Sequence, residues 1–305
     1  MSQNLPAVHR YTIGGFQFEA RSLPPGLYLV ATPIGNLRDV TLRALETLAS
    51  ADLICCEDTR ITSRLLKRYG IAKSLKPYHD HNAAKVRPAL LERLRGGASI
   101  ALVSDAGTPL ISDPGYKLVV GAIDDGHRIE VVPGASAPIM AVALSGIPAD
   151  RFLFAGFLPA KSAEKRRALE EVRSIPAALV LFEAPGRVTD TLEAVRTVLG
   201  DRRIVIAREL TKLHEEVMRG SADELLERIA SRQALKGEIT LVVAPPAEQA
   251  ADPVEIEEAL RMALLVAPPA RAAADVAKRF GVPKKDLYAL ALRTKARAGE
   301  NGDDE

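Results

Sequence analysis

Short apolar runs alternate with amphipathic stretches along the first 147 residues. Apolar runs predict strands at 26–32, 52–56, 98–103 and 128–132, with a weaker one at 74–78. The stretches between them predict helices near 38–50, 58–69, 82–95 and 113–125, the last opened by Asp113-Pro114 and ended by Gly126. Because strands that are apolar throughout are typical of parallel sheets with helices on both faces, residues 26–147 are predicted to form an α/β domain.

A second and less regular cycle begins after Pro148. Strands are predicted at 152–155, 178–183, 203–208 and 238–244, and helices near 162–173, 186–199 and 221–231. Residues 148–246 are therefore predicted to form a second α/β domain.

The two ends of the chain differ from this pattern. Residues 244–252 have the composition of a linker, and three short helices separated by Pro268-Pro269 and Gly281-Val-Pro283 are predicted beyond it. A glycine that ends one helix just before a basic helix resembles a helix-turn-helix, so residues 252–297 are expected to form a helical module. Residues 1–25 are expected to be an irregular arm, and residues 298–305 an acidic tail.

Charge and aromatic content bear on partners. The net charge of +2 does not indicate nucleic acid, but residues 261–297 contain nine Lys or Arg and two Asp. Such a basic segment can neutralise phosphates, although it can also be an ordinary solvated surface. Aromatic residues are 4% of the chain and Trp is absent, which argues against an extensive base-stacking platform. RNA recognition would then depend on shape, phosphate and ribose contacts.

The chain lacks the features of a membrane or secreted protein. No apolar run approaches the roughly 20 residues that span a bilayer, and residues 1–25 contain no signal-peptide core. The only cysteines, Cys55 and Cys56, are adjacent in a predicted strand and should point to opposite faces, which disfavours a disulfide between them. We expect two buried thiols and a cytoplasmic protein.

Three loops that follow predicted strands are rich in Pro, Gly and small hydroxyl residues. They contain Thr32 to Asn36, Ser104 to Gly115, and Pro133 to Pro138. Open α/β sheets bind ligands at the carboxyl ends of their strands. The first loop is neither a G-x-G-x-x-G nor a P-loop sequence, so a site made largely of backbone is expected instead.

Four motifs in this order resemble the tetrapyrrole methylase superfamily. They are Ala31-Thr-Pro-Ile-Gly-Asn-Leu37, Glu57-Asp-Thr-Arg60, Ser104-Asp-Ala-Gly-Thr-Pro109 and Gly237-Glu-Ile-Thr240. The resemblance covers about residues 26–246. It implies two α/β domains with an S-adenosylmethionine cleft between them, and a homodimer. Within the superfamily, the motifs resemble the branch that methylates the ribose 2′-hydroxyl of a decoding-centre cytidine in small-subunit ribosomal RNA.

The resemblance also implies which residues bind S-adenosylmethionine. From the first domain these are Pro33, Ile34, Ala106, Gly107, Thr108, Ile111, Ser136 and Ala137, and from the second Phe182, Glu183, Glu238 and Ile239. Thr108 departs from the family pattern, which often has Asp there, so a carboxylate contact to the cofactor is not expected at that position.

Polar residues near these loops are candidates for chemistry and for RNA contact. Glu57 and Asp58 could supply a general base for the ribose hydroxyl, with Arg60 holding one of them ionised, or the three could form a structural ion pair. His79 and His81 could contact RNA, transfer protons or cap a loop, and too few ligands accompany them to predict a metal site. The candidate phosphate contacts are Arg60, Lys161, Arg187, Lys284 and Lys285.

Two other functions remain open from the sequence. A methylase of a tetrapyrrole precursor would have the same fold and could bind its anionic substrate with the same arginines. A non-catalytic nucleic-acid-binding regulator would use the helix-turn-helix but leaves the three ligand loops unexplained.

Overall fold

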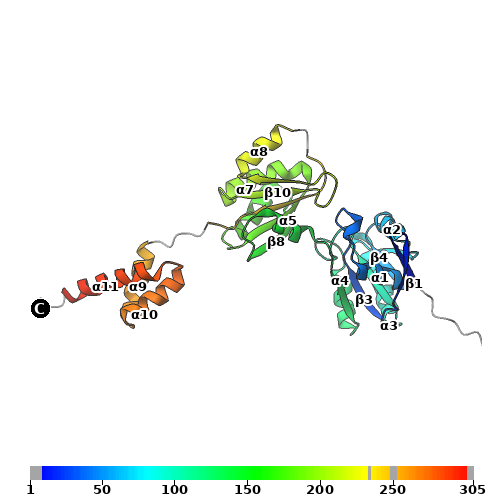
Figure 1. The fold of residues 1–305 in the computed structure, drawn as a ribbon, viewed down its shortest axis with the longest axis horizontal. Helices are drawn as coiled ribbons and strands as arrows, with labels where there is room; N and C mark the ends of the chain where they lie inside the picture. Colours follow the sequence, from blue (N-terminus) through cyan, green and yellow to red (C-terminus); the bar gives the residue numbers. More distant parts are fainter. Residues whose placement is uncertain (1–8, 233–234, 248–252, 301–305) are drawn as a thin grey trace, which may run out of the picture. The chain divides into compact units, whose positions relative to one another are not determined.

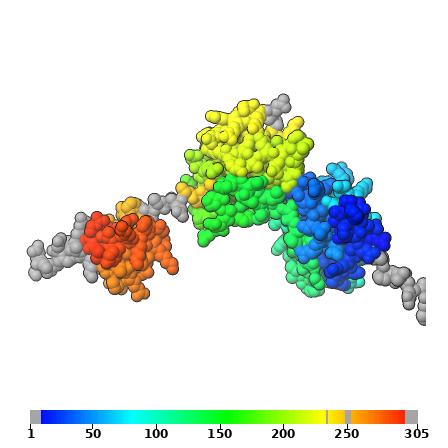
Figure 2. Space-filling model, in the orientation of Figure 1, coloured from blue at the N-terminus to red at the C-terminus, as the bar shows by residue number. Residues whose placement is uncertain are grey.

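The structure is a computed structural model that describes residues 9–232, 235–247 and 253–300. The chain divides into two compact units, residues 1–246 and 247–305. Figure 2 draws the described residues of the first in blue to yellow and those of the second in orange to red. Among the described helices, none is long and apolar enough to cross a membrane. The α/β fold class with an additional helical C-terminal unit is confirmed (Figure 1).

The first sheet is parallel throughout. Its strands are β3 (Gly26–Val30), β4 (Leu53–Cys56), β5 (Leu75–Pro77), β6 (Ser99–Val103) and β7 (Ile129–Val132), in the order β5-β4-β6-β3-β7. The side chains of β3 alternate between two apolar clusters: Tyr28 and Val30 face one, Leu27 and Leu29 the other. Helices must shield each apolar cluster from water. Because both faces of the sheet are buried in this way, β3 is apolar on both sides.

Two pairs of helices pack against these clusters, one pair on each face of the sheet. The helices α1 (Leu42–Ser50) and α2 (Thr59–Arg68) contribute to the cluster of Tyr28, while α3 (Asp80–Arg95) and α4 (Tyr116–Asp124) contribute to that of Leu27. Cys55 and Cys56 are buried, unbonded and divided between the two clusters, as their adjacency predicted. Burial raises the pKa of the Cys55 thiol to about 12, so this thiol is unreactive.

The N-terminal arm is not irregular where it is described. Strands β1 (His9–Ile13) and β2 (Phe16–Ala20) form an antiparallel hairpin around Gly14 and Gly15, which both have positive φ. Tyr11 is buried in the cluster that α1 covers, and the Thr12 amide donates to the Tyr69 carbonyl at 2.7 Å. The hairpin therefore extends the core, and the expectation of an irregular arm was wrong for residues 9–20.

Asp113 and Pro114 do not open helix α4, contrary to prediction. The helix begins at Tyr116, and its N-terminal boundary is Gly115, at φ 137°. A Cβ on Gly115 would lie 2.7 Å from side-chain carbons of both Leu102 and Leu110. Because the chain approaches the sheet this closely at Gly115, Asp113 remains in the loop before the helix. Gly126, at φ 75°, follows the helix end as predicted.

The second sheet is mixed. Its strands β8 (Phe152–Phe157), β9 (Ala178–Glu183), β10 (Ile204–Arg208), β11 (Glu216–Gly220) and β12 (Ile239–Val243) have the order β11-β10-β12-β9-β8, and β8 and β9 form the one parallel pair. Strand β11 was not predicted. It is a short edge strand in which Glu216 and Arg219 are charged, and its Glu216 pairs with Arg208 of β10 at 3.1 Å.

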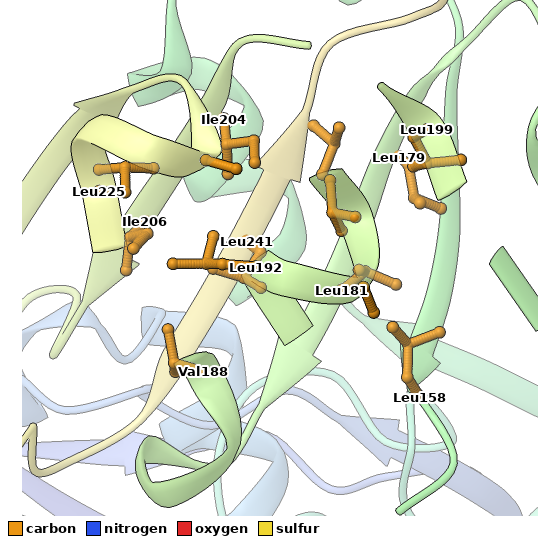
Figure 3. Packing of buried hydrophobic residues seen from close by; sticks show 14 of the residues in the cluster. Leu158, Leu179, Leu181, Val188, Leu192, Leu199, Ile204, Ile206, Leu225 and Leu241 are labelled. Carbon is orange, nitrogen blue, oxygen red and sulfur yellow. The ribbon is translucent and has the colours of Figure 1, made fainter. Parts of the chain in front are cut away.

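One face of this sheet is covered by α6 (Ser162–Val172), α7 (Val188–Leu199) and α8 (Ala222–Ala230) (Figure 1). Figure 3 shows the packing, in which Leu192 of α7 and Leu225 of α8 meet Leu181, Ile206 and Leu241 of the strands. These leucines are fully buried, so this face is the main apolar core of the second half.

Helix α5 (Ala137–Ser145), which the sequence analysis missed, covers the other face. It packs Ala141 with Val180, Val205 and Val242 of the second sheet, and Ile34 of the first half joins the same cluster. Arg219 of β11 donates to the carbonyl of Ser145 at 3.2 Å and to that of Leu144, which satisfies the helix end. Because α5 packs on the second sheet, it belongs to the second half. The boundary between the two halves therefore lies before α5 and not after residue 147.

Within residues 253–300 of the C-terminal unit there are three helices: α9 (Pro253–Leu264), α10 (Pro269–Phe280) and α11 (Lys284–Glu300). Their common core includes Leu260, Ala273, Val276 and Leu287. Gly281 ends α10 in the left-handed conformation, with φ 67°, as the helix-turn-helix interpretation required.

Candidate active site

A cavity of about 380 Å³ lies between the two halves of the first unit. This volume is in the usual range for small-molecule sites. Eleven of the twelve residues that the resemblance implied line it; Pro33 does not. The sequence analysis did not assign the other lining residues to the site: Ser112, Asp113, Pro138, Phe157, Ala184, Pro185, Gly237 and Thr240.

Backbone hydrogen bonds join the loops that form the first wall. Thr32 and Gly107 form an antiparallel bridge, with N–H to carbonyl distances of 2.9 and 3.1 Å. The Thr32 hydroxyl donates to the Ser104 carbonyl at 3.1 Å, and the Thr108 hydroxyl donates to the Ala135 carbonyl at 3.3 Å. Loops from three separate strands are thereby held as one surface before any ligand binds.

Gly107 lets the backbone line the cavity. Its φ is 84°, and a Cβ there would lie 3.2 Å from Cγ2 of Ile34 and 3.5 Å from the Ala135 carbonyl oxygen. A side chain at this position would therefore contact the first and third ligand loops, which form the same wall of the cavity. The residue fits the expected role of a close backbone approach to a ligand.

The segment before α4 has an unusual backbone. Leu110 and Ser112 have φ values of 74° and 65°, a region that side-chain-bearing residues rarely adopt. Ser112 also approaches the other half of the cavity, because a Cβ on Gly156 at the bulge in β8 would lie 3.4 Å from its Oγ. Strained residues cluster at functional sites because packing must hold them there.

The second wall consists of the end of β9 and the start of β12, where Glu183 pairs with Ile239 and Phe182 with Thr240. Phe182 lies between two aromatic rings, with centroid distances of 5.0 Å to Phe154 and 5.5 Å to Phe157. An apolar surface of this kind suits a flat ligand group such as a purine.

Glu183 is held in a buried network. Its Oε1 accepts from the Ala184 amide at 2.8 Å and lies 3.3 Å from Nε of Arg187, and its Oε2 accepts from the Thr191 hydroxyl at 2.5 Å. Lys165, also buried, donates to the same hydroxyl at 2.9 Å. Thr191 thus links the buried Lys165 to Glu183, and the half-buried Arg187 pairs with Glu183 directly, which fixes the end of β9.

A loop of the second half closes one end of the site. Thr211 Oγ1 accepts from the Asn36 amide at 3.2 Å, and a Cβ on Gly35 would collide with the Lys212 side chain. Lys212 Nζ lies 2.8 Å from Glu209 and 3.1 Å from Glu238. Contacts between the two halves therefore flank the cavity.

The predicted acidic pair separates into two different environments, and neither residue lines the cavity. Asp58 caps helix α2 and accepts from the Arg60 guanidinium at 2.6 Å, which lowers its pKa to about 2. Burial, with Asp105 and Asp80, raises the pKa of Glu57. Arg60 thus holds Asp58 ionised, and Asp58 is a weak base.

Asp113 lines the cavity, and the pKa of its carboxyl is shifted far from the ordinary value of an aspartate. Its pKa is raised to about 6, mainly by burial and further by the charges of Glu57 and Asp105. The sequence pattern indicated a helix cap at this position, so the residue was not considered for chemistry. A carboxyl at the end of a Gly- and Pro-rich ligand loop is the signal that could have identified it.

The remaining candidates have different surroundings. His79 precedes α3, and its ring is 6.0 Å from that of His81. Arg187 is half-buried and donates to the carbonyls of Leu158 and Pro159 at 2.5 and 3.0 Å, so its guanidinium is largely engaged within the fold. Lys161 pairs with Glu164 at 3.1 Å on an exposed helix start.

Lys284 and Lys285 are exposed at the start of α11. Within the described ranges, no group of three or more His, Cys, Asp or Glu is placed to hold a metal ion.

A family model described as tetrapyrrole (corrin/porphyrin) methylases matches residues 26–226. The chain belongs to this family. A second model, described as the RsmI C-terminal HTH domain, matches residues 250–295. The first match covers most of the cavity lining but ends before Gly237 to Thr240, and the second covers α9, α10 and most of α11.

The most similar relatives found within the tetrapyrrole methylase family include proteins named ribosomal RNA small subunit methyltransferase I. That of Mesorhizobium japonicum is 48% identical over 94% of this chain and 98% of the relative. That of Erythrobacter litoralis is 50% identical over 90% of this chain and 98% of the relative. That of Escherichia coli O157:H7 is 45% identical over 87% of this chain and 94% of the relative.

Several solved structures share the fold at lower identity. Diphthine synthase aligns with a TM-score of 0.57 and 18% identity over 72% of this chain and 89% of that structure. Uroporphyrin-III C-methyl transferase from Thermus thermophilus, complexed with S-adenyl homocysteine, aligns with a TM-score of 0.50 and 19% identity. The alignment covers 71% of this chain and 96% of that structure. At this identity the likeness concerns the fold alone.

We predict that Gly107→Val weakens S-adenosylmethionine binding by at least about tenfold, or about 1.4 kcal/mol, because the new side chain narrows the cavity. Isothermal titration calorimetry measures the affinity. Gly97→Val is the matched control, since Gly97 has nearly the same φ, 85°, but no atom within 4 Å of its added Cβ. Both variants lose stability through backbone strain, and equal affinities in the two would contradict the site assignment.

Proposed function

We propose that this protein transfers a methyl group from S-adenosylmethionine to the ribose 2′-hydroxyl of a cytidine in the decoding centre of small-subunit ribosomal RNA. The observation that carries the proposal is the coincidence of one cavity with the motif residues of a methylase family whose similar relatives are named for ribosomal RNA. The proposal includes action in the cytoplasm and the homodimer that the resemblance implies.

The residues around the cavity fit the cofactor. The lining is largely apolar, with Phe157 and Phe182 for the purine and backbone groups near Gly107 for polar contacts. Bound there, S-adenosylmethionine supplies an electrophilic methyl group. The chain supplies alignment: hydrogen bonds join the loops of the first wall, and the buried Glu183 network fixes the end of β9 in the second wall. Alignment of reactants can contribute about 7–11 kcal/mol to lowering a barrier.

The C-terminal unit suits contact with RNA phosphates. Helices α10 and α11 expose Arg271, Lys278, Lys284, Lys285 and Arg293, and the acidic residues between Arg271 and Arg293 are Asp275 and Asp286. Helix α9 carries the acidic Glu255, Glu257 and Glu258. We propose that this unit docks the ribosomal RNA while the cavity holds the cofactor. A tetrapyrrole substrate would give the basic helices α10 and α11 no role, and a non-catalytic regulator would give the cavity none.

Mass mapping of small-subunit ribosomal RNA tests the reaction. Cells without the gene should lack one ribose methyl at a decoding-centre cytidine, and the intact gene should restore it. Purified protein with S-adenosylmethionine should add the same methyl to small subunits from the deficient cells. If the RNA is identical with and without the gene, and purified protein adds nothing, the proposed function is wrong.

The docking role predicts an altered salt dependence for Lys284→Ala/Lys285→Ala. Each phosphate contact contributes about 0.7–0.9 to the slope of log K against log salt, so loss of two lowers the slope by up to about 2. Fluorescence anisotropy on a ribosomal RNA fragment at several salt concentrations measures it. Lys284→Arg/Lys285→Arg, which keeps both charges, should retain the slope. An unchanged slope in the alanine variant would exclude this docking role.

A further inference from the structure

The cavity is lined by three carboxylic acids: Asp113, Glu183 and Glu238. A general base for a ribose hydroxyl must reach the cavity and must have oxygens free to accept a proton. The three differ in how their oxygens are already used, and this difference selects one of them.

Glu183 and Glu238 are both engaged by cations. Glu183 is fully buried, and its two oxygens accept from Ala184 and Thr191 beside the Arg187 guanidinium. The Glu238 carboxylate is 70% exposed, and its Oε2 lies 3.1 Å from Nζ of Lys212. Hydrogen-bond donors and cations therefore already occupy both oxygens of Glu183 and one oxygen of Glu238.

Asp113 differs because none of the ion pairs in the described ranges involves it. The charged groups that act on its pKa are Glu57 after β4 and Asp105 after β6, both acidic. The nearby Ser104 hydroxyl donates to the Gly107 carbonyl at 3.0 Å. Two negative neighbours and partial burial increase its affinity for a proton.

The backbone around Asp113 fixes its position. Leu110 and Ser112 have positive φ, and Gly115 packs against the side chains of Leu102 and Leu110. Ser112 in turn lies beside the bulge at Gly156 on the opposite half of the site. A strained segment that is packed from both halves holds its carboxyl in place, as a positioned catalytic group requires.

We propose that Asp113 is the general base of the methyl transfer, in place of Glu57 or Asp58. Its carboxylate takes the proton of the ribose 2′-hydroxyl while the oxygen forms a bond to the sulfonium methyl carbon. The carbon–sulfur bond breaks and its electron pair stays on sulfur, which becomes a neutral thioether. Asp113 then releases the proton to water. The proposal rests on the proposed function, since it assumes a ribose hydroxyl as the nucleophile.

The role of Glu57 changes accordingly. Its negative charge raises the pKa of Asp113, so Glu57 acts on the reaction through Asp113 and not on the substrate. Because the active form of Asp113 is ionised, the rate should rise with pH through a midpoint of about 6 and then level off. Glu57→Gln should move this midpoint to lower pH and leave the plateau rate close to that of the wild type.

The test uses full-length protein and small subunits that lack the methyl group. Asp113→Asn should lower the single-turnover rate by about 10²–10⁴-fold and keep S-adenosylmethionine affinity within about threefold in calorimetry. Asp124→Asn, at an exposed position on α4 outside the cavity, is the matched control and should react normally. Asp113→Glu keeps a carboxyl and should recover part of the rate.

A readout without turnover is the carboxyl carbon resonance of Asp113 in protein labelled at aspartate. The resonance missing from Asp113→Asn should titrate with a midpoint of about 6. An Asp113→Asn protein that reacts at a near-normal rate, while the wild type methylates the RNA, would overturn the assignment of the base alone. A wild type that methylates no small-subunit RNA would instead overturn the proposed function.

Discussion

The site depends on the packing of helix α5 against the second sheet. The helix follows the third ligand loop of the first half, yet its side chains are buried with Val180, Val205 and Val242. Ile34, from the first ligand loop, joins the same cluster. Each large side chain buried there contributes about 1.5–3 kcal/mol. This shared apolar contact ties both walls of the cavity to one core, so the spacing between them is set by packing.

Much of this arrangement could be predicted from the sequence because it depends on local signals. Strands such as β3 and β6 are apolar throughout, and their loops contain Gly and Pro, so the parallel sheet and the ligand loops followed directly. Eleven of the proposed cofactor residues were placed by motif and line one cavity. Helix α5 was missed because it is apolar on every side and follows a Pro-rich loop, which hides its period.

Other features depend on contacts between residues far apart in the sequence. The role of Asp113 depends on Glu57, which comes from another loop, on Asp105 of its own loop, and on a backbone conformation that residue types alone do not show. Its Asp-Pro sequence suggests a helix cap, whereas Gly115 delays the helix. Arg187 looked like a phosphate contact, but Leu158, Pro159 and Glu183 engage its side chain within the fold.

The central claim is that both α/β halves bind the cofactor in one cavity. Hydrogen exchange with and without S-adenosylmethionine tests it most directly, since ligand contact slows local opening. The account predicts slower exchange in 104–111 of the first half and also in 181–185 and 237–240 of the second, with helix α11 unchanged. Protection confined to the first half, or protection of the C-terminal unit alone, would contradict it.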